Sequence, residues 1–144
     1  MNLRYLLDTN IVSELTRPWP RAHVLQRLDE HDGSLAMASV TLHELRYGLS
    51  LLPDSRRRQD LEAHLLKLLQ RLPVRPYDAR AASWHGVERA RLWQLGQTPP
   101  FADGQIAATA VTQGLILVTA NTNDFLCFDG LQLEDWTQPA TTPR

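Results

Sequence analysis

Four acidic residues each follow, or stand beside, an apolar stretch of the sequence, and their types and spacing suggest a site for chemistry. They are Asp8, Glu44, Asp103 and Asp124. Asp103 is the most informative, because it shares a helical stripe with Ile106, Ala107 and Ala110 in a helix predicted over 101–113. A carboxylate on the buried face of a helix is costly unless a partner satisfies it. The sequence therefore predicts a partner for Asp103.

Each acid taken singly also has a purely structural explanation. Asp8 and Asp124 follow apolar runs, where Asp is common as a turn or capping residue. Asp103 lies in the first turn of its predicted helix, where backbone N–H groups and the helix dipole favour a carboxylate. Glu44 on its own is an ordinary helix residue.

The four acids are harder to explain separately once their places in the chain are compared. Each lies near the C-terminal end of a predicted strand or at the start of the following helix, and parallel strands bring those ends to one edge of a sheet. Unit charges about 5 Å apart repel by roughly 3 kcal/mol per pair at an effective dielectric constant of about 20. Either some groups take up protons or a cation neutralises them. Oxygen ligands without His or Cys suit Mg²⁺ or Mn²⁺, and such an ion activates water for attack on a phosphodiester.

Strands and helices alternate in the chain that must position these acids, which predicts an α/β fold. The continuous apolar runs at 5–7 and 115–118 need cover on both faces, as in a parallel sheet. We therefore expect a three-layer α/β/α sandwich around a mainly parallel sheet, with the first strand in the centre. Further strands are expected at 35–38, 73–76 and 131–133, the last two at edges.

Helices are expected between these strands, and several have candidate N-cap residues. The apolar periodicity predicts helices at about 11–15, 21–30, 42–52, 56–69, 79–95 and 101–113. Thr9 or Asn10 is expected to cap the first of these, Ser39 or Thr41 the third, and Asp78 the fifth. The helices at 42–52 and 56–69 each carry a leucine stripe and are predicted to form an antiparallel pair.

Composition and length predict one globular domain in a reducing compartment. We place this domain at 1–136 and a polar tail at 137–144. The net charge of −1 excludes a basic field that would attract nucleic acid over the whole surface. Cys127 is the only cysteine, so no internal disulfide can form, and no apolar segment is long enough to span a membrane. A cytoplasmic location is expected.

Four segments give the chain a resemblance to the PIN-domain nucleases. They are LLDTN at 6–10, TLHELRYG at 41–48, ADGQIAATA at 102–110, and VTAN at 118–121 with Asp124 and Phe125. The first and third are the specific motifs, and the four occur in the family's order over about 3–136. Within this family the chain is most similar to toxins of the VapC/FitB type.

The resemblance implies a metal-dependent endoribonuclease that acts as the toxin of a toxin–antitoxin pair. It implies RNA as substrate, a small antitoxin as protein partner, a homodimer, and Mg²⁺ or Mn²⁺ as cofactor. By their places in the motifs, the catalytic and metal-binding carboxylates are Asp8, Glu44, Asp103 and Asp124, and the supporting polar residues are Thr9, Asn10, Thr119 and Asn121. Some members carry Asp where this chain has Asn121, so either Asn121 or Asp124 completes the site, and the number of metal ions stays open.

Two other readings of the sequence remain open. One is a PIN-fold nuclease that processes RNA or DNA and has no antitoxin. The other is a non-catalytic α/β binding module, although neither G-x-x-x-x-G-K-[ST] nor G-x-G-x-x-G occurs in the chain. Against a receiver domain, the only lysine, Lys67, lies in a predicted surface helix rather than after a late strand.

Overall fold

The first strand, β1 (Tyr5–Leu7), lies in the centre of a five-stranded sheet. In the computed structural model, which describes residues 2–139, β1 pairs in parallel with β2 (Leu35–Ala38) and with β4 (Ile116–Val118). The edge strands are β3 (Val74–Arg75), beside β2, and β5 (Leu133–Glu134), beside β4. The order is β3-β2-β1-β4-β5, and every pairing is parallel. The carboxyl ends of the strands therefore share one edge, as predicted.

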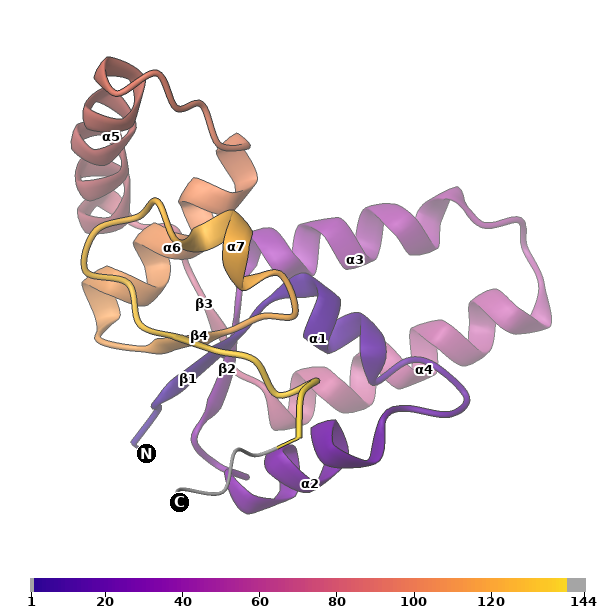
Figure 1. Cartoon of the computed structure of the whole chain (residues 1–144). Coiled ribbons are helices and arrows are strands. Elements are labelled where there is room, and N and C mark those ends of the chain that lie inside the picture. The colour runs from indigo at the N-terminus through magenta and orange to yellow at the C-terminus, as the bar shows by residue number, and fades with distance from the viewer. Residues whose placement is uncertain (1, 140–144) are drawn as a thin grey trace.

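The helices of the described residues cover both faces of this sheet (Figure 1). They are α1 (Thr9–Glu14), α2 (Ala22–Glu30), α3 (Ser39–Leu51), α4 (Arg56–Arg71), α5 (Ala79–Gln94), α6 (Phe101–Gln113) and α7 (Thr122–Phe125). Helices α1 to α4 gather on one side, while α5 and α6 lie on the other. The predicted three-layer α/β/α sandwich is confirmed.

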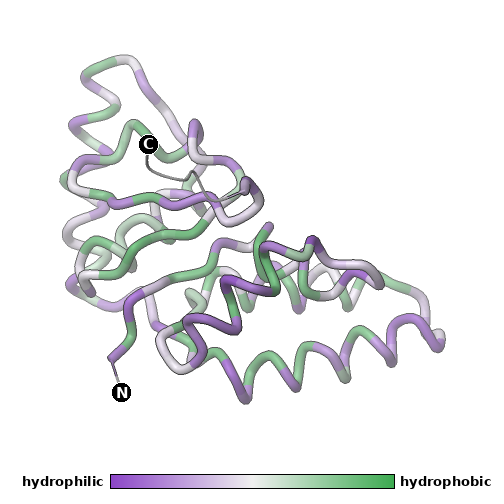
Figure 2. Tube along the Cα trace, turned by 60° about the horizontal axis from the view of Figure 1, so that its bottom comes forward, coloured by the Kyte–Doolittle hydropathy of each residue, from purple (hydrophilic) through white to green (hydrophobic). Residues whose placement is uncertain are grey.

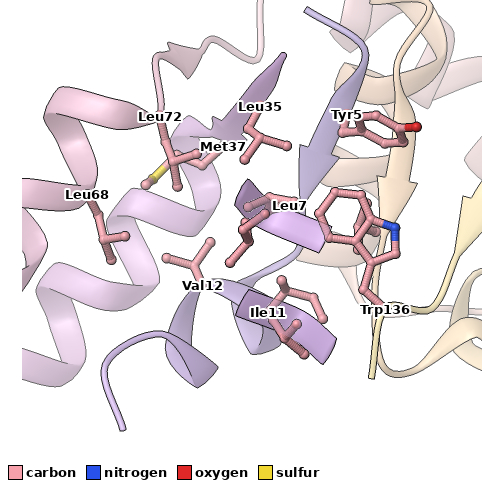
Figure 3. Packing of buried hydrophobic residues seen from close by; sticks show 12 residues of the cluster. Tyr5, Leu7, Ile11, Val12, Leu35, Met37, Leu68, Leu72 and Trp136 are labelled. Carbon is pink, nitrogen blue, oxygen red and sulfur yellow. The ribbon is translucent and has the colours of Figure 1, made fainter. Parts of the chain in front are cut away.

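Alternating side chains of β1 supply both cores. Tyr5 and Leu7 enter the core under α1, α2 and α4, where Trp136 closes one end (Figure 3). Leu6 points to the other face and packs in the core that includes Leu92 of α5 and Ile106 of α6. All three strand residues are buried, as expected for a strand covered on two faces. This burial fixes the position of the residue that follows, Asp8.

Helices α3 and α4 form the predicted antiparallel pair, which extends away from the sheet (Figure 1). Leu65 and Leu68 of α4 are buried, whereas Tyr47 and Leu51 of α3 and Leu66 of α4 are exposed. Figure 2 shows hydrophobic and hydrophilic positions alternating along these two helices. Gly114 ends α6 in the left-handed conformation, with φ of +67°, where glycine carries no steric cost.

Two of the three predicted helix caps were wrong. Asp8 itself is the N-cap of α1, because the buried strand ends at Leu7 and places the carboxylate over the Thr9 N–H. The N-cap residue of α3 is Ala38, whose methyl group cannot accept a hydrogen bond from the helix start. Ser39 instead accepts a hydrogen bond from the Tyr77 N–H (3.3 Å). The predicted cap Asp78 is confirmed, since it accepts from the Ala81 N–H at 2.9 Å.

The C-terminal segment differs slightly from expectation. The last strand, Leu133–Glu134, begins two residues later and ends one residue later than predicted. Thr137 is buried, and its N–H and hydroxyl both donate to Asp135. Residues 140–144 of the predicted tail lie outside the described residues. No helix in the described part of the chain is long and apolar enough to cross a membrane.

Candidate active site

Asp8 stands at the carboxyl end of the central strand, and hydrogen bonds fix both of its carboxylate oxygens. Oδ1 accepts from the Thr9 N–H at 2.8 Å. Oδ2 accepts from the Thr119 hydroxyl at 2.8 Å and from the Asn10 amide at 3.1 Å. Asp8 is only 6% exposed, so its orientation is set before any ligand arrives.

The supporting polar residues join the ends of β1 and β4. Thr119 follows β4, is fully buried, and accepts from the Asn121 N–H at 3.0 Å while it donates to Asp8. Asn10 bridges the same two segments, because its carbonyl oxygen accepts from the Ala120 N–H at 3.1 Å. The Thr9 hydroxyl donates to Thr41 of α3 at 3.2 Å. The network ties three elements around one carboxylate.

Asp103 reaches the site from the first turn of α6. The apolar residues on its stripe, Ile106, Ala107 and Ala110, pack in the core beneath α6, as the helical spacing predicts. Asp103 itself is half-buried at the edge of that core. The next residue, Gly104, lies so close to His85 that a Cβ atom there would overlap the Nε2 of His85. Close packing between α5 and α6 thus holds the turn that carries Asp103.

Of the other predicted site residues, Glu44 and Asn121 line a cavity with Asp8 and Asp103, whereas Asp124 does not. Glu44 projects from α3 and lines a cavity of about 400 Å³ together with Asp8, Asp103 and Asn121. Asp124, in the first turn of α7, is exposed and does not line this cavity. Its charge nevertheless contributes to raising the pKa of both Asp8 and Asp103. Three of the four predicted acids meet in one cavity, and the fourth lies near it.

The pKa values of the three cavity acids are all raised. Burial, followed by the charges of Asp8, Asp124 and Glu44, raises the pKa of Asp103 to about 6. Burial also raises the pKa of Asp8, although its three hydrogen bonds act in the opposite direction. The partial loss of solvent around Glu44, together with the charge of Asp8, raises the pKa of Glu44. The site therefore favours proton uptake or a cation.

The donor set suits a hard divalent cation that keeps much of its water shell. The lining residues that can offer oxygen ligands are Asp8, Glu44, Asp103, Thr9, Asn10, Ser13 and Asn121, and none of the lining residues is His or Cys. Within residues 2–139, no three His, Cys, Asp or Glu side chains close around a common point. Mg²⁺ commonly takes one or two carboxylates and several waters, which is compatible with this open arrangement.

Sequence reasoning missed three residues that line the same cavity: Ser13, Arg17 and Ile106. Ser13 lies one helical turn after Thr9, so helical spacing from Thr9 could have identified it. Arg17 lies beyond the end of α1 and beyond the end of the predicted helix, so helical spacing did not include it.

A second hollow adjoins the cavity. It is a groove of about 310 Å³ between α1, α3 and α4, lined largely by leucines of the two long helices. Thr9, Ser13 and Glu44 line both the groove and the acidic cavity. A single ligand could therefore contact the groove and the acids together.

Comparisons with known proteins agree with this architecture. The PIN domain family matches residues 5–129. The "tRNA(fMet)-specific endonuclease VapC" of Shigella flexneri is 37% identical over 134 residues, which cover 93% of this chain and 98% of that protein. The "Toxin FitB" of Neisseria gonorrhoeae is 31% identical, with 91% and 97% of the two chains covered.

Solved structures show the same fold. A chain in the crystal structure of DNA-bound VapBC from Salmonella typhimurium superposes with a TM-score of 0.84 at 31% identity, covering 93% of this chain and 98% of that one. A chain of FitAcB from Neisseria gonorrhoeae gives a TM-score of 0.81 at 30% identity, with 92% and 97% covered. The match spans nearly the whole length of these relatives, and this chain belongs to the PIN-domain family, in its VapC/FitB group.

Proposed function

We propose that this protein is a divalent-cation-dependent endoribonuclease and the toxin of a toxin–antitoxin pair. The observation that carries the proposal is the meeting of Asp8, Glu44 and Asp103 in one cavity at the carboxyl edge of the sheet. The names of the relatives, which include endonucleases, ribonucleases and a toxin, support it. A dependence on a divalent cation accords with this family and with the oxygen-only donor set.

Asp8 and Asp103 would hold the cation, which we take to be Mg²⁺ or Mn²⁺. When bound, such a cation lowers the pKa of a water and offsets the charge that builds on the scissile phosphate. Thr119 and Asn10 engage both lone pairs of Asp8 Oδ2, whereas Oδ1, which accepts only from the Thr9 N–H, retains a lone pair for a further ligand. Glu44 and Asp124 would act through water, because both are more exposed than Asp8 and Asp103.

Glu44 has the position of a group that can orient or accept a proton from an attacking water. Its carboxylate lines the cavity and reaches solvent, so a proton that it accepts can leave to bulk water. Asn121, which also lines the cavity, is placed to donate its amide N–H groups to a phosphate oxygen. The resemblance to PIN-domain nucleases implies that water attacks phosphorus and the bond to the 3′-oxygen breaks. The products would then carry 5′-phosphate and 3′-hydroxyl ends.

The groove beside the cavity is the proposed docking site of the antitoxin. Its leucines come from α3 and α4 and from Leu52 between them, the pair for which the sequence predicted leucine stripes. Solved relatives of this chain are VapBC and FitAB assemblies, and an occupant of this groove would also block the acids through Thr9 and Glu44. A homodimer stays a prediction from the family, which light scattering of the isolated toxin would check.

The variants Asp8→Asn and Asp103→Asn test the catalytic proposal. Each removes one charge without changing side-chain size, and we expect each to reduce RNA cleavage at least 100-fold, the scale of a lost essential electrostatic group. The first substrate to try is tRNA(fMet), the RNA named for relatives from Shigella and Salmonella. Asp60→Asn, on the exposed face of α4, is the matched control and should keep full activity. Full activity in Asp103→Asn would contradict the proposal.

A further inference from the structure

One basic residue stands at the rim of the acidic cavity. Arg17 lines the cavity with Asp8, Glu44 and Asp103, and it is the only Lys or Arg among the lining residues in the described chain. Its side chain is 61% exposed, so a ligand in the cavity can reach the guanidinium. The proposed function does not use it.

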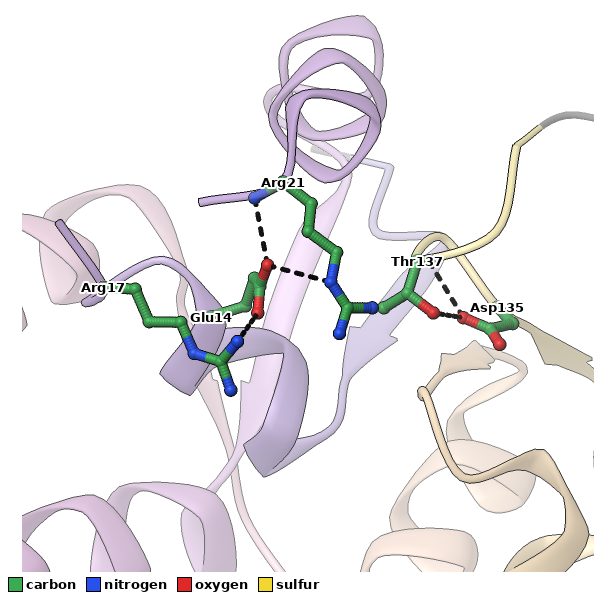
Figure 4. A network of polar contacts seen from close by, with 5 residues as sticks. All are labelled: Glu14, Arg17, Arg21, Asp135 and Thr137. Atoms are coloured by element: carbon green, nitrogen blue, oxygen red, sulfur yellow. Dashed lines mark hydrogen bonds and ion pairs between the residues drawn. The ribbon is translucent and has the colours of Figure 1, made fainter. Parts of the chain in front are cut away.

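A buried carboxylate holds this arginine in place (Figure 4). Glu14 at the end of α1 has a side chain only 5% exposed, and its Oε2 lies 3.0 Å from Arg17 Nη1. Its other oxygen accepts from the Arg21 backbone N–H at 3.0 Å and lies 3.5 Å from Arg21 Nε. Both oxygens of the Glu14 carboxylate thus have partners, and Arg17 contacts this carboxylate through one guanidinium nitrogen, Nη1.

This anchoring leaves donors of Arg17 available for a ligand. A guanidinium carries five N–H groups, and the contact with Glu14 engages one nitrogen. Arginine presents the remaining donors in a fixed fork that matches two oxygens of a phosphate. Because Glu14 restricts the side chain beforehand, less conformational entropy is lost when a phosphate binds.

The negative charge in and around the cavity favours a cationic side chain such as Arg17. Three carboxylates line it, and an RNA chain brings further negative charge on each side of the scissile bond. A divalent cation held by Asp8 and Asp103 would offset charge at the reacting phosphate, whereas the neighbouring phosphates need counter-charges of their own. The net charge of −1 means that attraction must come from local cations.

We propose that Arg17 binds a backbone phosphate of the RNA next to the scissile bond, and that Glu14 positions it. The inference rests on the proposed ribonuclease function and adds a substrate-binding residue to it. The competing explanation is that Arg17 only neutralises the buried Glu14. Arg21 separates the two, because it pairs with the same carboxylate but does not line the cavity.

The test compares Arg17→Gln, Arg17→Lys and Arg21→Gln. Binding of a short single-stranded RNA is measured by fluorescence anisotropy in Mg²⁺, with each change made in an Asp103→Asn chain so that the RNA stays intact. We expect Arg17→Gln to weaken binding about tenfold, as for a lost charge-assisted hydrogen bond. The slope of log affinity against log salt should fall by about 0.7, the value for one phosphate contact on a single strand. Arg17→Lys should keep the slope but bind less tightly, since a lysine lacks the fork.

Arg21→Gln should leave both affinity and slope unchanged. Equal losses in Arg17→Gln and Arg21→Gln, or an unchanged salt slope in Arg17→Gln, would overturn the inference. Thermal melts show whether the two glutamine variants fold. If Arg17→Gln does not fold, Arg17→Lys still tests the inference through its affinity, and RNA binding as tight as in the Asp103→Asn chain alone would overturn it. Cleavage by the parent chain is measured alongside: normal cleavage with no effect of Arg17→Gln defeats only this inference, whereas no cation-dependent cleavage of RNA defeats the proposed function.

Discussion

At the scale of single residues, the surroundings of Asp103 make its ionised form unfavourable. Burial and three neighbouring acids raise the pKa of Asp103 to about 6 from its ordinary value of 3.8. The folded protein therefore binds a proton more tightly than the unfolded chain does. Stability from this group is highest at low pH and is lost as the pH rises through about 6.

This raised pKa predicts a pH-dependent difference between the cation-free parent and Asp103→Asn. Above pH 7 the variant should be more stable, by at most about 3 kcal/mol. The pKa is raised by about two, and each pKa step of one is worth about 1.4 kcal/mol, which solvent screening reduces at this half-buried site. The difference should shrink towards zero as the pH falls to about 4, because the parent's Asp103 is then protonated as well. Urea unfolding in EDTA at several pH values measures it. A difference that does not change with pH would show that Asp103 is not under this strain.

At the scale of elements, the contact between α5 and α6 holds the acid-bearing turn. His85 of α5 is buried, its Nδ1 is hydrogen-bonded to the Tyr77 hydroxyl at 2.8 Å, and its Nε2 edge packs on Gly104. Burial and the charge of Arg89 lower the pKa of His85, so the ring stays neutral at neutral pH. Only a glycine leaves room for this ring one residue from Asp103.

Gly104→Ala should therefore damage the site without touching an acid. The new methyl overlaps His85, whose ring is tethered by Tyr77, so α6 must shift. We expect a loss of 1–3 kcal/mol in stability, about the usual cost of overpacking, and a clear loss of cleavage rate. Adding His85→Ala makes space and should restore part of both. The double-mutant cycle is read by thermal melts and initial rates, and strictly additive losses would disprove the contact's role.

The elements also show what sequence patterns can and cannot reveal. Apolar runs predicted the strands around Asp8, and helical periodicity predicted α6 with its acid on the inner stripe, because both signals are local. The cap of α1 was misassigned because the chain path at the end of β1 turns Asp8 itself over the helix start. The contact between His85 and Gly104 links residues on separate helices, so no spacing in the sequence reveals it.

At the scale of the whole molecule, the parallel sheet gathers the acids and the α3–α4 pair adds a neighbouring groove. The sheet's class, central strand and convergence of three acids could be predicted, since alternating strands and helices leave few parallel topologies. The position of Arg17 could not, because it depends on the turn after α1 and on its pairing with Glu14. Only the leucine stripes of the two predicted helices indicated an apolar surface where the groove lies.

The groove gives a prediction about the partner. Leu49→Asp places a charge among the groove leucines and should weaken binding of the cognate antitoxin at least tenfold, as for a central interface residue. Leu66→Asp, on an exposed face of α4 outside the groove, is the matched control. Calorimetric titration with the antitoxin measures both, and RNA cleavage by Leu49→Asp should persist. Equal antitoxin affinity in the two variants would place the antitoxin elsewhere.

The most direct test of the central claim is cation-dependent cleavage of a defined RNA with the product ends mapped. EDTA should abolish cleavage by the purified toxin, and added Mg²⁺ or Mn²⁺ should restore it, because Asp8 and Asp103 would then regain the ion that offsets their repulsion. Sequencing should find 5′-phosphate ends on the fragments. Cleavage that continues unchanged in EDTA would contradict the account, since the carboxylates would then act without a cation.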